Sequence, residues 1–414
     1  MMPPGSGGIY VHVPFCVRKC NYCDFVSYPA SRYAEAMGQY LASVTREFCL
    51  RESELERIRP IRTLYVGGGT PTCVPWRQLA EFIATLLAQI EQVNSLGSLD
   101  GRSSGAGLEV TVEANPGTVD QRSLAALKES GANRLSLGFQ SLDAAELRAL
   151  GRLHSPADCI QAYKWGRAAG FDNISVDLIL GAPEQTRESL FKTFDILMSM
   201  RPEHISAYCL SVEEGTPLAR ALADGSQTVP DDDDVADSYE WLVEQVEAAG
   251  YARYEVSNFA LPGFESAHNV GYWTSSYYVG LGVAAHSHLD GARHGAVRSW
   301  NVESVEDYMA AIEKGVRPLA GFEERNAFQE AQDSLMLGLR MSEGVDLVEM
   351  GRRFGLDLLT EYAGKFTDLA EAGLVEFLEG RGKLTPGGFL LGKLVFAECV
   401  ECGTGSHFRC NGSP

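Results

Sequence analysis

Three cysteines stand close together near the start of the chain, where Cys16, Cys20 and Cys23 form a CxxxCxxC motif. Thiolates are soft ligands, and the metals that suit them are zinc and the iron of iron–sulfur clusters. Structural zinc takes four ligands, and this motif offers no fourth cysteine or histidine. A [4Fe–4S] cluster held by three thiolates keeps one iron open to another ligand. Because Lys19 and Asp24 make the segment a polar loop rather than a core strand, we interpret the motif as a cluster site.

The cysteine motif follows the first of six β-rich segments, which alternate with helical patterns along the first two thirds of the chain. Strands that alternate with helices predict βαβ units and a parallel sheet. Six units are too few for a (β/α)8 barrel, so we expect an α/β fold with a partial (β/α)6 TIM-like barrel over residues 1–250. In such barrels the loops after the strands carry the chemistry. The β-rich segments are residues 8–14, 63–71, 108–116, 134–141, 174–183 and 204–212.

The remainder of the chain has a different pattern. Residues 251–320 are rich in glycine and aromatic residues, and we expect an irregular region and linker at the edge of the barrel. Residues 321–397 have the pattern of helices closing with a small hairpin, which predicts a C-terminal helical, winged-helix-like domain. The Gly/Ser-rich stretch 93–109 predicts a flexible insertion, and residues 398–414 predict a disordered tail. We assign no role to the cysteines in and next to this tail, which are Cys399, Cys402 and Cys410.

Composition excludes several classes of protein. A net charge of −20 argues against a nucleic-acid binder, which would carry a basic surface, so a packing or partner role suits the winged-helix-like domain better than DNA binding. No apolar run reaches the roughly 18 residues of a membrane helix. The opening residues MMPPGSGG lack the basic and apolar regions of a signal peptide. We therefore expect a soluble, cytoplasmic protein that is not embedded in a membrane.

The segment CVRKCNYCDF, which follows YVHVPF, resembles the radical S-adenosylmethionine (SAM) superfamily. From Ile9 to about Phe396 the chain resembles the branch that contains oxygen-independent coproporphyrinogen III dehydrogenase (HemN) and the heme chaperone HemW. The resemblance implies a [4Fe–4S] cluster on the three cysteines, with the amino and carboxylate groups of SAM on its fourth iron. In this superfamily an electron from the cluster can cleave SAM into methionine and a 5′-deoxyadenosyl radical. That step would need an electron donor such as flavodoxin or ferredoxin.

Other strand ends match the same branch. VGGGTPT resembles its glycine motif, where the backbone approaches the methionyl part of SAM, although such a loop in isolation could be only a tight turn. SAM has an ammonium, a carboxylate and a ribose diol, which call for carboxylates and an arginine. Taken singly, each such residue could instead be salt-bridged at a barrel mouth. The residues that the resemblance implies around SAM are Tyr10, Tyr22, Gly68, Gly69, Thr70, Glu113, Gln140, Arg152 and Asp177.

Two functions fit this resemblance. One is the dehydrogenase, an oxidoreductase of porphyrin biosynthesis that decarboxylates two propionates of coproporphyrinogen III. The other is a chaperone that binds heme and passes it to an acceptor. The dehydrogenase motif CxxxCxxCxC has a fourth cysteine where this chain has Phe25. The dehydrogenase also has an N-terminal extension that helps to cover its substrate, and the 15 residues before Cys16 are too few to supply it. The segment HNVGYW at 268–273 matches the HNxxYW motif of the chaperone. These three features favour the chaperone.

Heme binding needs an iron ligand, and imidazole is a common one, while aromatic residues stack on the porphyrin. His268 of HNVGYW is the predicted axial ligand, although it could serve only to order its own segment. His286 and His288 in AAHSHL are alternative ligands for which a structural role is the stronger expectation. The resemblance implies a respiratory cytochrome or oxidase as the heme acceptor. The sequence leaves open whether SAM is cleaved, and therefore whether the protein is an enzyme.

Overall fold

The computed structural model describes residues 6–95 and 107–400. The six β-rich segments form neighbouring parallel strands in the order β1-β4-β5-β6-β7-β8, within a twelve-stranded sheet. Strands β8 and β1 are not paired with each other, so the barrel stays open. The predicted partial barrel is therefore confirmed. The parallel strands are β1 (Gly7–Val13), β4 (Ile61–Gly68), β5 (Glu109–Ala114), β6 (Arg134–Gln140), β7 (Ile174–Leu180) and β8 (His204–Cys209).

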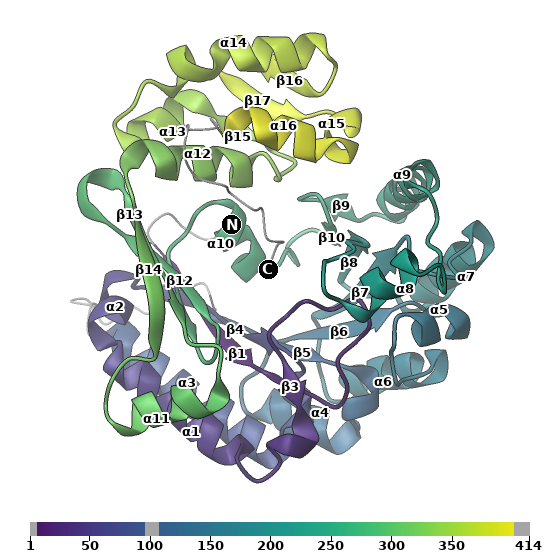
Figure 1. Cartoon of the computed structure of the whole chain (residues 1–414), viewed down its shortest axis with the longest axis vertical. Coiled ribbons are helices and arrows are strands. Elements are labelled where there is room, and N and C mark those ends of the chain that lie inside the picture. Colours follow the sequence, from purple (N-terminus) through teal and green to yellow (C-terminus); the bar gives the residue numbers. More distant parts are fainter. Residues whose placement is uncertain (1–5, 96–106, 401–414) are drawn as a thin grey trace.

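Amphipathic helices cover the convex face of this sheet (Figure 1). In α3 the residues Leu79, Phe82, Ile83, Leu86 and Ile90 recur at helical spacing and are buried in the main core. Helices α4, α6 and α7 begin at the capping residues Asp120, Ser155 and Thr186. The helices of this part are α1 (Met37–Leu50), α2 (Glu52–Arg57), α3 (Trp76–Ser95), α4 (Gln121–Glu129), α5 (Ala144–Ala149), α6 (Pro156–Ala168), α7 (Arg187–Met200), α8 (Pro217–Ala223) and α9 (Asp232–Ala248).

The concave face of the sheet is polar. On β1 the side chains of Ile9, Val11 and Val13 are buried in the core against the helices, while Tyr10 and His12 contact each other on the opposite face. Complete TIM barrels fill this interior with branched apolar residues, whereas here it keeps hydrogen-bonding groups. By the same alternation, the concave face includes Thr63, Tyr65, Glu113, Arg134, Ser136, Asp177, His204 and Ser206.

Residues 251–320, for which we predicted an irregular region, instead extend the sheet at both ends. β10 and β9 follow β8, while β11 pairs parallel with β1 and is followed by antiparallel β12, β13 and β14. Helix α10, which carries HNVGYW, lies between the sheet and the C-terminal helices (Figure 1). These elements are β9 (Ala252–Arg253), β10 (Asn258–Ala260), α10 (Ala267–Trp273), β11 (Tyr278–Leu281), β12 (His286–Asp290), β13 (Ala296–Asn301), α11 (Val305–Glu313) and β14 (Leu319–Arg325).

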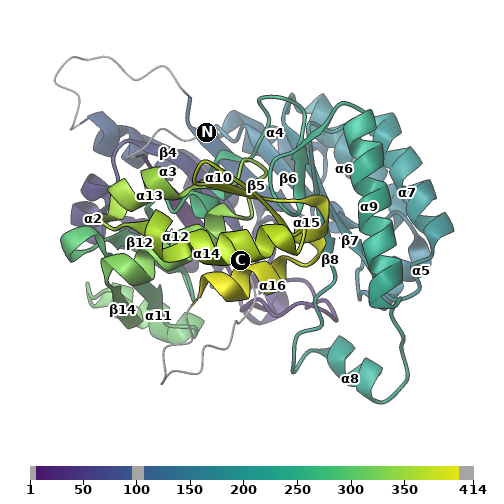
Figure 2. The same cartoon turned by 90° about the horizontal axis from the view of Figure 1, so that it is seen from above.

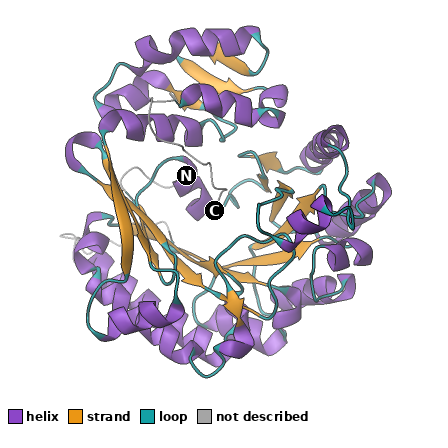
Figure 3. Cartoon of the chain, in the orientation of Figure 1, coloured by secondary structure: helices purple, strands orange, loops and turns teal. Residues whose placement is uncertain are grey.

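The C-terminal helices form a separate layer across the open side of the sheet (Figure 3). They pack with a small sheet of order β15-β17-β16 around their own core, which includes Leu335, Phe354 and Phe366. This confirms the predicted helical, winged-helix-like domain. Its elements are α12 (Ala327–Gly338), β15 (Val345–Asp346), α13 (Leu347–Phe354), α14 (Leu358–Glu371), β16 (Val375–Leu378), β17 (Arg381–Leu384), α15 (Pro386–Leu390) and α16 (Gly392–Cys399).

Two predicted segments fall largely outside the described residues. The proposed insertion at 93–109 includes residues 96–106, and the proposed tail includes residues 401–414, with Cys402 and Cys410. Cys399 is buried at the end of α16. Within the described part of the chain, no helix is long and apolar enough to cross a membrane.

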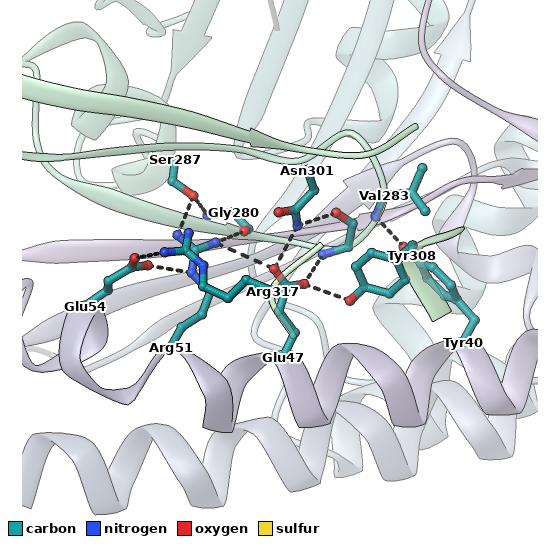
Figure 4. A network of polar contacts seen from close by, with 11 residues as sticks. Tyr40, Glu47, Arg51, Glu54, Gly280, Val283, Ser287, Asn301, Tyr308 and Arg317 are labelled. Atoms are coloured by element: carbon teal, nitrogen blue, oxygen red, sulfur yellow. Dashed lines mark hydrogen bonds and ion pairs between the residues drawn. The ribbon is translucent and has the colours of Figure 1, made fainter. Parts of the chain in front are cut away.

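A buried polar network joins α1 to the strands that extend the sheet (Figure 4). The Glu47 carboxylate is fully buried and accepts hydrogen bonds from the Gly282 amide at 2.8 Å, the Asn301 amide at 2.7 Å and the Tyr308 hydroxyl at 2.7 Å. Arg51 lies beside it, at 3.6 Å, and donates to the Gly280 carbonyl at 2.7 Å. Glu47 therefore ties α1, β13, α11 and the end of β11 together.

We expect the substitution Glu47→Leu to lower the free energy of unfolding by about 3 kcal/mol or more, because it leaves three buried donors without their acceptor and removes a negative charge beside the buried Arg51. Urea denaturation followed by circular dichroism measures this change. The control is Glu188→Ala, which removes an exposed ion pair with Lys192 and should leave the unfolding midpoint unchanged. Equal midpoints for the two variants would contradict the stabilising role of Glu47.

Candidate functional site

The cysteine motif lies in a loop at the carboxyl end of β1. Cys16 belongs to β2 (Phe15–Cys16), which pairs parallel with β3 (Tyr28–Pro29) and so closes the base of the loop. Cys20 and Cys23 lie within the loop, and the Cys23 amide donates to the Cys20 carbonyl at 3.3 Å. Figure 2 shows α8 on the same side as this loop, and the Leu218 amide donates to the Asn21 carbonyl at 2.9 Å. The loop is thus fixed at both its base and its tip.

The three thiols are partly exposed and lie among polar groups. The Cys16 sulfur lies 3.6 Å from the Thr70 hydroxyl, and the Arg152 guanidinium donates to the Cys20 sulfur at 3.4 Å. Burial raises the pKa of the Cys16 thiol, and raises that of Cys23 to about 11. Bound iron would stabilise the thiolates, since metal binding releases thiol protons. Within residues 6–95 and 107–400, no three or more His, Cys, Asp or Glu side chains gather around a position for a single metal ion.

The first two cysteines are connected through three side chains from different loops. The Asn115 amide donates to the Thr70 hydroxyl at 2.7 Å, and the Arg152 guanidinium donates to the Asn115 carbonyl oxygen. With the contacts of Cys16 to Thr70 and of Cys20 to Arg152, this makes one continuous chain of polar contacts. These contacts therefore fix the relative positions of four segments around the cysteines, which are the loops after β1, β4 and β5 and the segment after α5.

Glu113 lies at the end of β5, beside the glycine loop. Its carboxylate accepts from the Tyr65 hydroxyl at 2.7 Å and from the Gly68 amide at 3.1 Å. Burial, with the nearby charge of Asp177, raises the pKa of Glu113 to about 7. Burial also raises the pKa of Asp177, whose carboxylate accepts from the Ser136 hydroxyl at 3.2 Å. Two half-buried carboxyls thus face the concave side, and desolvation disfavours the charged form of each.

The glycine loop approaches the backbone after β1 closely, and the end of β6 carries a strained residue and unsatisfied polar atoms. A Cβ on Gly69 would lie within 3.0 Å of the backbone of Val13 and Phe15, so only glycine permits this approach. Gln140 has a φ of 63°, next to a register shift in the pairing of β6 with β7. Such strain is typical of functional sites. Gln140 Oε1 and Arg152 Nε are buried without a hydrogen-bond partner among the described residues, which fits a polar cofactor beside the cysteines.

The two predicted tyrosines lie at different depths. Tyr22 packs beside Leu150 and Ile179 next to the cysteine loop, and burial raises its pKa. Tyr10 lies deeper in the concave face, where its hydroxyl is 3.0 Å from His12 Nδ1 and its ring stacks on Tyr65 at 6.2 Å between centroids. The structure therefore brings Tyr22 to the cysteines, and places Tyr10 one layer below them.

His268 lies at the other end of the strands. Its Nδ1 is 2.7 Å from the hydroxyl of Thr63 near the start of β4, and its Nε2 is 2.9 Å from the Tyr272 hydroxyl. The side chain is buried, and desolvation lowers its pKa to about 3. Neutral imidazole has one donor and one acceptor nitrogen, and both are occupied here. We predicted His268 as the axial heme ligand, but in this structure it has no free nitrogen for an iron atom.

Sequence reasoning missed two residues that organise the site. Asn115 joins Thr70 to Arg152, and Tyr65 orients Glu113. Asn115 follows Glu113 by two positions, so strand alternation could have placed both on the same face. Tyr65 lies inside a β-rich run, where nothing in the sequence distinguishes it from a packing residue.

Comparison with known proteins identifies the family of this chain. The radical SAM superfamily matches residues 10–197, and the HemN C-terminal domain matches residues 329–391. The chain is similar to the heme chaperone HemW of Mycobacterium tuberculosis, with 35% identity over 84% of this chain and 85% of that protein. It is also similar to the heme chaperone HemW of Bacillus subtilis, with 32% identity over 94% and 97%.

Among solved structures, coproporphyrinogen III oxidase (HemN) of Escherichia coli has the same fold, with a TM-score of 0.78 and 21% identity. That likeness covers 95% of this chain and 90% of the other. At this identity the likeness shows the fold alone, whereas the identities of 32–35% with HemW proteins extend over most of both chains. The chain therefore belongs to the HemW family of the radical SAM superfamily.

Proposed function

We propose that this protein is a heme chaperone, which binds heme and transfers it to an acceptor protein. The observation that carries the proposal is its similarity, over 84% and 94% of the chain, to proteins named heme chaperone HemW. Phe25 supports it, because this half-exposed side chain stands where the dehydrogenase motif has a fourth cysteine. The heme acceptor would be a respiratory cytochrome or oxidase. The transfer of heme would take place in the cytoplasm.

The proposed cofactors are a [4Fe–4S] cluster on Cys16, Cys20 and Cys23 and SAM on the open iron. The nearby unpartnered atoms of Gln140 and Arg152 support a polar ligand at this position. When bound, the two cofactors can supply a 5′-deoxyadenosyl radical if an electron donor such as flavodoxin or ferredoxin reduces the cluster. The residues proposed to surround SAM are Tyr10, Tyr22, Gly68, Gly69, Thr70, Glu113, Gln140, Arg152 and Asp177.

The test of this function compares it with the alternative, oxygen-independent coproporphyrinogen III dehydrogenase. The protein is purified without oxygen, its cluster is reconstituted, and heme binding is measured beside the decarboxylation of coproporphyrinogen III. We expect stable heme binding, seen as a shifted Soret band, and transfer of the bound heme to an apo-cytochrome. Formation of protoporphyrinogen without stable heme binding would reject the chaperone proposal and favour the dehydrogenase.

The cluster ligands have a separate test. We expect Cys20→Ala to lose most of the iron, sulfide and visible absorbance of the reconstituted cluster, because a cubane with one of its three thiolates removed is poorly held. The matched control is Cys49→Ala, which changes an exposed cysteine on α1 and should keep the full cluster. Equal iron and sulfide contents in the two variants would show that Cys20 is not a ligand.

The affinity for SAM should depend on pH through Glu113. Burial raises the pKa of this carboxyl to about 7, and its ionised form is the better acceptor for ribose hydroxyls. Because the ionised fraction grows as pH rises, the affinity of the cluster-loaded protein should increase about tenfold between about pH 6 and pH 8. Equilibrium dialysis measures it. The increase should vanish in Glu113→Gln and persist in Glu129→Gln, an exposed control; an unaltered profile in Glu113→Gln would exclude this role.

A further inference from the structure

The histidines of the described chain differ in whether they could bind iron. Five of them are buried, and each of these has at least one ring nitrogen in a hydrogen bond. His286 and His294 are exposed, and neither ring has a hydrogen bond within the described residues. An iron ligand needs an unengaged nitrogen with open space in front of it, which His286 and His294 alone provide in this part of the chain. The five buried histidines are His12, His154, His204, His268 and His288.

Their positions distinguish the two exposed histidines. His294 lies in the 3-10 turn Ala292–His294 between β12 and β13. His286 begins β12, just after the turn that follows β11. Because β11 runs parallel to β1 and β12 returns antiparallel, His286 lies opposite Gly280 and so level with Tyr10, in the middle of the strand whose carboxyl end leads into the cysteine loop. A Cβ on Gly282 in this turn would lie 2.5 Å from the His12 carbonyl, which confirms how close the turn is to that end.

His286 also faces the concave side. Its neighbour Ser287 accepts a hydrogen bond at 2.9 Å from Arg51, which directly follows α1, so Ser287 points to the convex face. Successive strand residues point to opposite faces, and His286 therefore points into the concavity. His288, the next residue on the same face, contacts Glu330 of the C-terminal domain at 2.8 Å. The imidazole of His286 thus points to the concave side and is exposed.

Aromatic packing orients this imidazole. His286 pairs with Trp300 on β13, and the two rings lie 5.8 Å apart with an angle of 24° between their planes. Trp300 pairs in turn with Gly321 on β14, where a Cβ would lie 2.5 Å from the indole. The glycine lets the indole lie across the strand. Partial desolvation of this exposed ring and the charge of Arg298 lower the pKa of His286, which favours the neutral imidazole that binds metals.

We propose that His286, rather than His268, is the axial ligand of the heme iron, and that Trp300 is a positioning residue that fixes the plane of its imidazole. The inference rests on the proposed function, for which it names the binding site. A single ligand at an exposed rim suits a cargo that must leave again, whereas His268 would have to give up its contacts with Thr63 and Tyr272 to reach an iron. His288 is a weaker candidate for the iron ligand, because its Nε2 already contacts the Glu330 carboxylate.

The experiment titrates anaerobic, cluster-loaded protein with hemin and records the Soret band. We expect His286→Ala to weaken hemin binding by about tenfold or more and to shift the band, with cluster absorbance unchanged. Added imidazole should restore the spectrum, because it fills the space left by the side chain. The matched control, His294→Ala, removes the other exposed histidine and should bind hemin as the unsubstituted protein does. Trp300→Ala should weaken binding, and Trp300→Phe should restore most of it.

The possible outcomes separate this inference from the proposed function. If the unsubstituted protein binds no hemin, both the chaperone proposal and the ligand assignment fail. If it binds hemin and His286→Ala keeps the same spectrum and affinity, the assignment to His286 is wrong while the chaperone proposal stands. A spectrum lost in His268→Ala but kept in His286→Ala would return the ligand to the HNVGYW segment.

Discussion

The chain of polar contacts from Cys16 through Thr70, Asn115 and Arg152 to Cys20 is the interaction on which the candidate site depends. The cysteine loop is polar and half-exposed, so apolar burial contributes little to its position. Hydrogen bonds between strand ends replace that burial, and charge-assisted ones from an arginine are the stronger kind. The same arginine places a positive charge beside a thiol that must become a thiolate. One set of contacts thus both holds the loop and prepares its chemistry.

A second line of contacts begins below the site. His268 stacks on Tyr65 with 5.1 Å between ring centroids, and Tyr65 donates to Glu113, which accepts from Gly68 of the glycine loop. The HNVGYW segment therefore packs beneath Tyr65 and Glu113, which contact the glycine loop. The motif can therefore serve to pack against Tyr65 and to orient Glu113, and this role needs no contact between His268 and a ligand. The low pKa of His268 agrees with that role, since the ring stays neutral between its two partners.

The sequence predicted the partial barrel, the C-terminal domain and the place of the cysteines, because those depend on local patterns such as strand–helix alternation and CxxxCxxC spacing. It did not predict the strands within residues 251–320, of which β11 and β10 join the sheet by pairing with β1 and β8, far away in the sequence. The HNVGYW motif also led us to predict His268 as the heme ligand and to treat His286 only as an alternative. Exposure and free ring nitrogens are set by tertiary contacts, and no single sequence displays them.

The two halves of the proposed site lie on different parts of the sheet, so their spacing needs its own support. The cysteine loop follows β1, whereas His286 lies on β12 among the added antiparallel strands. Helix α1 joins these parts, because the Tyr40 hydroxyl donates to the His12 carbonyl on β1 and accepts from the Val283 amide after β11. Glu47, two turns further along α1, binds Gly282 and Asn301. Buried polar networks favour one arrangement over alternatives when every member is satisfied, and this network thereby sets the distance between cluster and heme ligand.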